Sequence, residues 1–244
     1  MDIYKSLAKS YDLLQPKEEI LKQKPFFEEI TGKYRIKTCL DCACGTGWHL
    51  FMLDDFGLSC YGSDISSEML NISRDSLNGK NIILKKGSFK NLNKIWKIKF
   101  DMIICMSTSF PHMLSDLDVM VSLKSIYSQL NDDGILIIDN GFSDKLLKNK
   151  PKFIPARILE DTAFYFFLEY PDRSKVIFNI LQINKTKDSF NHNVYSMAYN
   201  AIGKSKFDNY FKKTDFKKID YFGDFMFTNY SVANSNRLIV LAQK

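Results

Sequence analysis

The residues best suited to chemistry lie in one short segment, residues 40–47 (LDCACGTG). The apolar residues 37–42 predict a strand that leads into it, and residues 47–56 can form a helix after it. Gly45 and Gly47 would let the backbone turn tightly and let a ligand approach the main chain. The helix would offer free backbone amides at its start. The segment therefore predicts a ligand-binding loop, of the dinucleotide kind or of the S-adenosylmethionine kind.

Asp41 distinguishes these two ligands. A dinucleotide loop follows the pattern Gly-x-Gly-x-x-Gly, and its third glycine would fall here on Leu50. The carboxylate of Asp41 at the loop entrance would serve a pyrophosphate poorly, but it suits a cationic group. S-adenosylmethionine carries an α-ammonium and a sulfonium and has no phosphate. The loop therefore favours S-adenosylmethionine.

Asp64 is the second candidate for ligand binding. It ends the strand predicted over residues 58–64 (LSCYGSD). An acidic residue at this place can accept both hydroxyls of a ribose. The alternative is that Asp64 only caps the next helix. Both cofactor types use such a carboxylate, so Asp64 supports a nucleoside ligand without naming it.

The predicted elements alternate along the first part of the chain. Ser66 is expected to cap a helix that runs to Leu77, and an Asn-Asp-Asp-Gly turn at 131–134 is expected before the fifth strand. Further strands are predicted over 81–85, 100–106 and 134–139, and further helices over 15–32 and 116–130. This alternation of continuous apolar strands and helices predicts an α/β fold with a doubly wound, mostly parallel sheet. Ligands bind such sheets outside the carboxyl ends of the strands.

The pattern changes near residue 151. Two β-rich runs, 163–170 and 175–183, flank a turn signal, and a third strand is predicted over 192–200. A helix over 203–213 and an antiparallel pair of strands, 216–222 and 237–242, follow. The expected organisation is a lid and cofactor-binding part (1–150), a β-rich insert (151–200) and a C-terminal part (201–244) that completes the same seven-stranded domain.

Composition excludes several classes of protein. The 244 residues are 45% apolar and 25% charged, with a net charge of +6 and no recognised nucleic-acid motif, so nucleic acid is not the expected partner. No segment is long and apolar enough for a membrane span. Five cysteines without zinc spacing predict reduced, buried thiols in a cytoplasmic protein, with Cys39 and Cys42 on opposite faces of their strand. Three scattered histidines predict no metal site.

Residues 41–47 (DCACGTG), 62–66 (GSDIS) with Met69, and 133–136 (DGIL) together resemble the class I S-adenosylmethionine-dependent methyltransferase superfamily over nearly the whole chain. The resemblance implies that Asp41 holds the methionine ammonium, that the loop backbone follows the methionine part and that Asp64 binds the ribose. The implied set of cofactor residues is Tyr4, Tyr11, Asp41, Ala43, Gly45, Thr46, Gly47, Asp64, Ile65, Met69, Gly87, Ser88, Phe89 and Met106. Ser88 departs from the family pattern, which often has an aspartate there.

Residues 106–113 (MSTSFPHM), with 138–140 (IDN) downstream, are similar to glycine N-methyltransferase-like enzymes, and residues 11–14 (YDLL) are similar to aminosugar N,N-dimethyltransferases. Both groups methylate small amines, and in both an insert after the fifth strand covers the acceptor pocket. This implies transfer of a methyl group to a small-molecule amine, with S-adenosyl-L-homocysteine as the product. The alternatives are an O-methyltransferase, a tRNA-modifying enzyme and a cofactor-binding partner protein without catalysis. The oligomeric state is left open.

His112 is the candidate general base, because it follows the fourth strand and histidine titrates near neutrality. The alternative is an ordinary histidine at a helix start, and His49 is a second candidate. Tyr4 and Tyr11 are expected to form an N-terminal lid, as the resemblance implies, with Tyr11 beside His112 in catalysis. The aromatic run 164–167 either lines a pocket for a cationic amine or forms one buried face of a sheet.

Overall fold

Seven strands form the central sheet of the computed structural model, which describes residues 3–244. Their order is β3-β2-β1-β4-β5-β11-β10, and β1 to β5 are parallel. β11 runs antiparallel to both β5 and β10, so the predicted C-terminal pair completes the sheet. The strands are β1 (Thr38–Asp41), β2 (Ser59–Asp64), β3 (Ile83–Lys86), β4 (Phe100–Cys105), β5 (Leu130–Asn140), β10 (Lys218–Phe222) and β11 (Leu238–Gln243).

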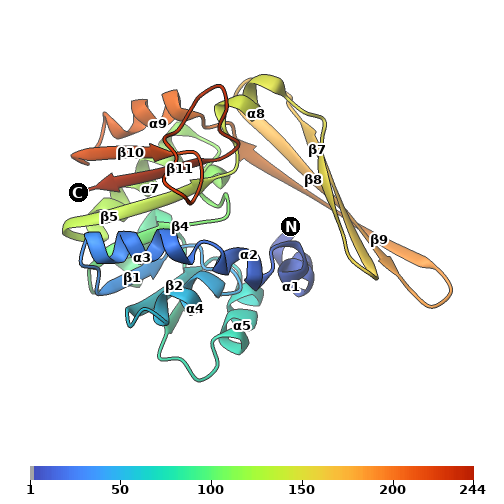
Figure 1. Ribbon diagram of the computed structural model, residues 1–244, viewed down its shortest axis with the longest axis horizontal. Helices are drawn as coiled ribbons and strands as arrows, with labels where there is room; N and C mark the ends of the chain where they lie inside the picture. Colours follow the sequence, from blue (N-terminus) through green and yellow to red (C-terminus); the bar gives the residue numbers. More distant parts are fainter. Residues whose placement is uncertain (1–2) are drawn as a thin grey trace.

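Helices cover both faces of this sheet (Figure 1). One face packs against α3 (Lys24–Lys33), α4 (Trp48–Asp54) and α5 (Ser67–Ser76). The other face packs against α6 (Leu92–Ile95), α7 (Asp116–Gln129) and α9 (Lys204–Phe211). The predicted doubly wound α/β fold is therefore confirmed. The remaining helical segments are α1 (Ile3–Leu14), α2 (Lys17–Leu21), η1 (Phe89–Asn91), η2 (Phe110–His112) and α8 (Asp144–Asn149).

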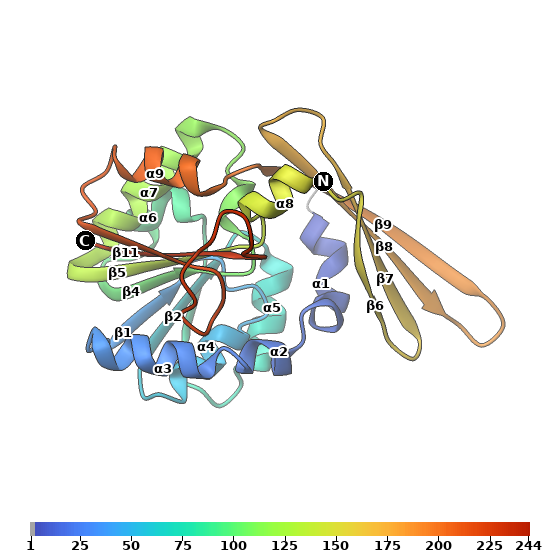
Figure 2. The same ribbon diagram turned by 45° about the horizontal axis from the view of Figure 1, so that its top comes forward.

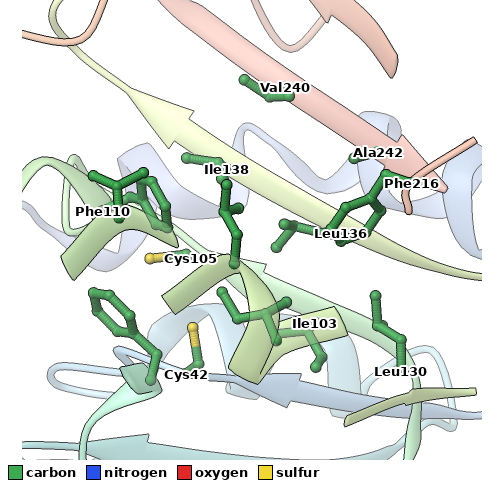
Figure 3. Packing of buried hydrophobic residues seen from close by; sticks show 14 of the residues in the cluster. Cys42, Ile103, Cys105, Phe110, Leu130, Leu136, Ile138, Phe216, Val240 and Ala242 are labelled. Carbon is green, nitrogen blue, oxygen red and sulfur yellow. The ribbon is translucent and has the colours of Figure 1, made fainter. Parts of the chain in front are cut away.

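The cysteines belong to the two cores. Cys39 lies in the core under α3 and α4, whereas Cys42 and Cys105 lie side by side in the other core, beside Phe110 (Figure 3). All five cysteines are buried and free. The strand geometry therefore places Cys39 and Cys42 on opposite faces, as the sequence predicts.

A second sheet projects from the body (Figures 1 and 2). It is antiparallel in the order β6-β7-β8-β9, with β6 (Phe153–Ile158), β7 (Thr162–Glu169), β8 (Lys175–Lys185) and β9 (Phe190–Asn200). Three of these strands match the predicted ones, and β6 was not predicted. Because β6 is short and contains Pro155, its sequence does not show the alternation of a strand. Helix α1 lies between this sheet and α5 (Figure 2).

Two local predictions differ from the structure. The single helix expected over 15–32 is instead α2 and α3, because Pro16 precedes α2 and Pro25 lies in the first turn of α3, where its missing N–H does no harm. The turn expected at 131–134 is instead part of β5, which pairs irregularly with β4 here and takes Asp133 through φ +61°. Ser66 caps α5 as predicted, accepting from the Met69 amide at 3.3 Å.

Phe26 supports the loop between β10 and β11. Its ring is fully buried, stacks on Phe227 with ring centroids 4.6 Å apart and meets Phe225 edge-on. We expect Phe26→Ala to lower the free energy of unfolding by about 3–5 kcal/mol, because it leaves a cavity under this loop. Phe190→Ala, at a 70% exposed ring, is the matched control and should change stability by less than about 0.5 kcal/mol. Urea unfolding midpoints measure both, and equal midpoints would contradict the packing described.

Candidate functional site

Two neighbouring cavities lie beside the carboxyl ends of the parallel strands. The smaller, of about 220 Å³, is bounded by the ends of β1, β2 and β3 and by the segment after β4. The larger, of about 630 Å³, lies among α1, the ends of β4 and β5, and the projecting sheet. Tyr4 and Tyr11 of α1 line both cavities and form the wall between them. The arrangement gives two ligands a common boundary.

The smaller cavity gathers most of the residues predicted to hold the cofactor. Nine of them line it: Tyr4, Tyr11, Ala43, Gly45, Asp64, Ile65, Met69, Ser88 and Phe89. His112 lines it as well. Residues far apart in the chain meet here because parallel strands bring their carboxyl ends to one edge.

Asp64 organises the entrance of this cavity. One carboxylate oxygen accepts from the Gly45 amide at 2.9 Å, and the other accepts from the Ser66 amide at 2.8 Å. The carboxylate therefore ties the loop after β1 to the loop after β2. Gly47 begins α4 with φ +91°, and a Cβ there would lie 2.5 Å from the Ser73 hydroxyl. Only glycine can adopt this positive φ and fit against Ser73 without strain.

Asp41 is the buried charge of the site. Its side chain is 1% exposed and accepts from the Ala43 amide at 3.1 Å. Burial, against the opposing hydrogen bond from the Ala43 amide and with a smaller contribution from the charge of Asp64, raises the pKa of this carboxyl to about 7. Among residues 3–244 no lysine, arginine or histidine forms an ion pair with Asp41. A buried carboxylate without a cation, beside two glycines, fits the ammonium of S-adenosylmethionine.

Five predicted cofactor residues do not line the cavity: Asp41, Thr46, Gly47, Gly87 and Met106. Thr46 is buried behind the loop, and the Gly87 amide donates to the Asp64 carbonyl at 2.9 Å. Met106 is 1% exposed and packs in the core under α4.

The Ser88 hydroxyl accepts from the Lys90 amide and thereby caps η1. Ile65, which is 58% exposed, and Met69 line the smaller cavity from just before α5 and from its first turn.

His112 sits in an aromatic cluster at the boundary of the cavities. Its Nε2 lies 2.7 Å from the Tyr4 hydroxyl, and its ring centroid lies 4.4 Å from that of Tyr199. Burial lowers the pKa of His112 to about 4. The ring is therefore neutral at pH 7, and the expectation that it titrates near neutrality is wrong. It can still act as a neutral hydrogen-bond acceptor next to Tyr4.

Other candidates from the sequence lie away from the cavities. His49 is 5% exposed, packs against Phe27 and contacts the Gln23 amide oxygen through Nε2 at 3.2 Å. In the aromatic run 164–167, Phe164 is fully buried and only Phe166 lines the larger cavity. The run is thus mainly one face of a sheet, with a single ring turned to the cavity.

A chain of hydrogen bonds crosses the wall of the larger cavity, and it was not predicted. The Tyr11 hydroxyl donates to Gln15, whose amide donates to the Ser107 hydroxyl at 2.7 Å. The Ser107 amide donates to Asp139 at 3.0 Å, and Arg237 pairs with the same carboxylate. Asp139 near the end of the fifth strand was the one available signal, because polar residues at such ends reach the ligand edge.

The backbone after β4 is unusual. Ser107 and Thr108 have φ of +54° and +62°, which are uncommon for residues that are not glycine. The Thr108 hydroxyl accepts from the Gly141 amide at 3.0 Å, and the Thr108 amide donates to the Asp139 carbonyl. These bonds hold two strained residues at the cavity wall, a pattern that is typical of ligand sites.

Comparison with known proteins places this geometry in a family. A family model described as "Methyltransferase domain" matches residues 39–134. A glycine/sarcosine N-methyltransferase of Aphanothece halophytica is 29% identical over 66% of this chain and 66% of its own length. A dTDP-3-amino-3,6-dideoxy-alpha-D-glucopyranose N,N-dimethyltransferase of Streptomyces fradiae is 28% identical over 41% of this chain and 38% of its length. These matches support the resemblance to the class I S-adenosylmethionine-dependent methyltransferases, with a methyltransferase domain over residues 39–134 of this chain.

The fold of this methyltransferase is also found in solved structures. An S-adenosylmethionine-dependent methyltransferase from Clostridium acetobutylicum ATCC 824 superposes with a TM-score of 0.84, covers 98% of each chain and is 20% identical. The match includes the projecting sheet because it spans almost the whole chain. The family and the fold predicted from the sequence are confirmed. The matched segments span at most two thirds of the two relatives' lengths.

Two structural features are absent from residues 3–244. No helix in this range is both long enough and apolar enough to cross a bilayer. No group of three histidine, cysteine, aspartate or glutamate side chains in the same range could hold a metal ion.

The pKa of Asp41 predicts how cofactor binding depends on pH. Affinity for S-adenosylhomocysteine should rise from pH 6 to 7.5, because Asp41 then becomes ionised and attracts the ligand ammonium. Asp41→Asn should bind more weakly and without this pH dependence. Isothermal titration calorimetry measures both proteins. A pH dependence that persists in Asp41→Asn would show that another group titrates.

The raised pKa of Asp41 also affects the stability of the protein without bound cofactor. The folded state holds a proton on Asp41 up to about pH 7, whereas the unfolded chain loses it near its ordinary value of 3.8. Asp41 therefore makes the free energy of unfolding fall as pH rises through this window. We expect Asp41→Asn to remove this fall and to be more stable than the wild type at pH 8. Thermal melts at pH 5 and pH 8 measure the difference, and equal behaviour of the two proteins would contradict the shift.

Proposed function

We propose that this methyltransferase transfers a methyl group from S-adenosylmethionine to the nitrogen of a small-molecule amine. The observation that supports it is the pair of cavities that share Tyr4 and Tyr11. The smaller is lined by the carboxylate of Asp64, with the buried carboxylate of Asp41 at the end of the neighbouring strand β1. The larger has the volume of a small-molecule site. The relatives named for glycine, sarcosine and an aminosugar also act on amines.

The residues of the chain mainly position the reactants. S-adenosylmethionine supplies a methyl group on a sulfonium that is already reactive. Asp41 and Asp64 hold the cofactor at the strand ends, while Tyr4 and Tyr11 place the acceptor against it. Orientation of this kind can contribute roughly 7–11 kcal/mol to the rate. The covering sheet and α1 keep water away from the boundary between the two cavities.

His112 acts in this proposal as a neutral acceptor. Its lowered pKa makes it too weak a base to deprotonate an alkylammonium before attack. It can accept a hydrogen bond from the attacking amine or fix the Tyr4 hydroxyl that does so. The amine therefore loses its proton to water at a rate set by its own pKa. Tyr11 has a catalytic role in this proposal, which its place in the lining of both cavities supports.

The alternatives have less support. A tRNA substrate would need a basic surface with exposed aromatic residues, and the larger cavity is instead covered by a sheet and a helix. A cofactor-binding protein without catalysis would have no need of a second cavity beside the first. The five buried, free thiols suit a reducing compartment, in line with the cytoplasmic location that we propose.

A thermal melt tests the cofactor assignment. Saturation with S-adenosylhomocysteine at about a hundred times its dissociation constant should add about 2.7 kcal/mol. For a chain of this length the midpoint should rise by about 5–10 °C. NAD at the same concentration should leave it unchanged. A rise with NAD alone would overturn the proposal, and mass spectrometry of amines incubated with S-adenosylmethionine tests the transfer itself.

His112→Ala tests the role of the aromatic cluster. Turnover should fall by about tenfold or more, because the acceptor loses a hydrogen-bonding partner. The dissociation constant of S-adenosylhomocysteine should change little. Profiles of kcat against pH from 6 to 9 should stay parallel in wild type and variant, since His112 does not titrate there. Loss of an ionisation near pH 7 in the variant would instead identify His112 as a titrating base.

A further inference from the structure

The larger cavity has charged groups besides the tyrosine wall. Lys22, Arg157 and Arg237 line it together with one carboxylate, that of Glu19. Lys22 and Glu19 pair with each other at 2.7 Å, and both are well exposed. Two guanidinium groups therefore determine the charge of the remaining wall.

Arg237 is held by a buried carboxylate. Its Nη1 lies 2.5 Å from both oxygens of Asp139, whose side chain is 2% exposed, while the arginine side chain is 40% exposed. A guanidinium has five N–H donors in a planar fork. The ion pair with Asp139 uses only Nη1 and orients the guanidinium plane. Nε and Nη2 are therefore left to donate to a ligand. Phe225 packs against the same guanidinium.

Arg157 forms no ion pair with a carboxylate among residues 3–244, although the pKa of the exposed Glu19 is lowered mainly by Lys22 and to a smaller extent by the charge of Arg157. Arg157 lies on β6, half-buried, and its Nε donates to the Leu13 carbonyl at 2.6 Å. In the part of the chain that the structure describes, no aspartate or glutamate oxygen lies within ion-pair distance of it. The bond to Leu13 orients the guanidinium and leaves both Nη groups as donors. Such a group binds carboxylate or phosphate oxygens well because its fork matches their geometry.

Besides these charges and the polar side chains of Gln15, Gln23, Ser107 and Thr108, the cavity has an apolar part. Aromatic rings of Phe142, Phe166, Phe178 and Tyr199 line it, with Met197 beside them. Its volume of about 630 Å³ falls within the roughly 300–1,000 Å³ of cavities that enclose drug-sized ligands. An amino acid as short as glycine would leave this aromatic part unfilled.

We propose that the methyl acceptor joins its amine through an apolar or aromatic body to an anionic group, and that Arg157 and Arg237 bind this anion. The proposal rests on the function proposed above, because the amine lies at the wall formed by Tyr4 and Tyr11. The body of the acceptor then fills the aromatic part of the cavity. The anion is a carboxylate or a phosphate, since a guanidinium fork recognises both.

Binding of substrate-like probes tests this proposal without catalysis. The probes are 3-phenylpropionate, 2-phenylethyl phosphate and the neutral 3-phenylpropan-1-ol, titrated by calorimetry into enzyme saturated with S-adenosylhomocysteine. At least one anion should bind the wild type more tightly than the alcohol. The anion that binds more tightly shows whether the methyl acceptor carries a carboxylate or a phosphate. Equal binding of all three, or no binding of either anion, would overturn the proposal.

Variants assign the effect to the guanidinium. Arg157→Met should weaken binding of the preferred anion by about tenfold, as expected for a lost charge-assisted hydrogen bond, and leave the alcohol unchanged. Arg157→Lys should lie between Arg157→Met and the wild type. Arg173→Met is the matched control, because Arg173 is exposed in the turn between β7 and β8 and does not line the cavity.

Two outcomes would contradict the assignment. Arg157→Met could bind the anion as the wild type does, or it could lose the alcohol as strongly as the anion, which would mean that the cavity had changed shape. Failure of the proposed function is seen separately, in the absence of a melting shift with S-adenosylhomocysteine. If that shift and amine methylation are present while the anion has no effect, this inference alone is wrong.

Discussion

The carboxylate of Asp64 is the contact on which the arrangement of the site depends. It accepts from Gly45 on one side and from Ser66 on the other, so the loops after two neighbouring strands share a single acceptor. This fixes the glycine loop against the start of α5 and gives the cofactor cavity its entrance. Asp41 then lies behind the loop without a cation, and its raised pKa is the electrostatic cost of keeping a carboxylate ready for a cationic ligand.

Helix α1 links this site to the rest of the protein. It packs against α5 on one side and against β9 on the other, so a single helix joins the cofactor-binding body to the projecting sheet. Tyr4 and Tyr11 thereby reach both cavities. Movement of the sheet relative to the body would alter the wall between the two ligands. The projecting sheet is therefore coupled to both cavities through one helix.

The two arginines of the larger cavity illustrate different uses of one side chain. Arg237 stabilises a buried carboxylate, which would otherwise lie unpaired at the end of β5. Arg157 is anchored only by a backbone carbonyl. In our proposal both guanidinium groups donate to a ligand, although that of Arg237 also belongs to the fold through its pair with Asp139. Residue type alone does not distinguish these roles, because they depend on the burial and pairing of each charge.

Sequence alone determined the order of the elements, the glycine loop, Asp41 and Asp64, because these depend on local periodicity and on the rule that ligands bind at strand ends. It also indicated the family and nine residues of the cofactor cavity. Tertiary structure decided the rest. Prolines divided one expected helix, burial removed the titration of His112 from neutral pH, and Met106 turned into the core. Gln15, Ser107, Arg157 and Arg237 meet at one cavity only because strands and a helix distant in the chain are packed together, and no local pattern records such contacts.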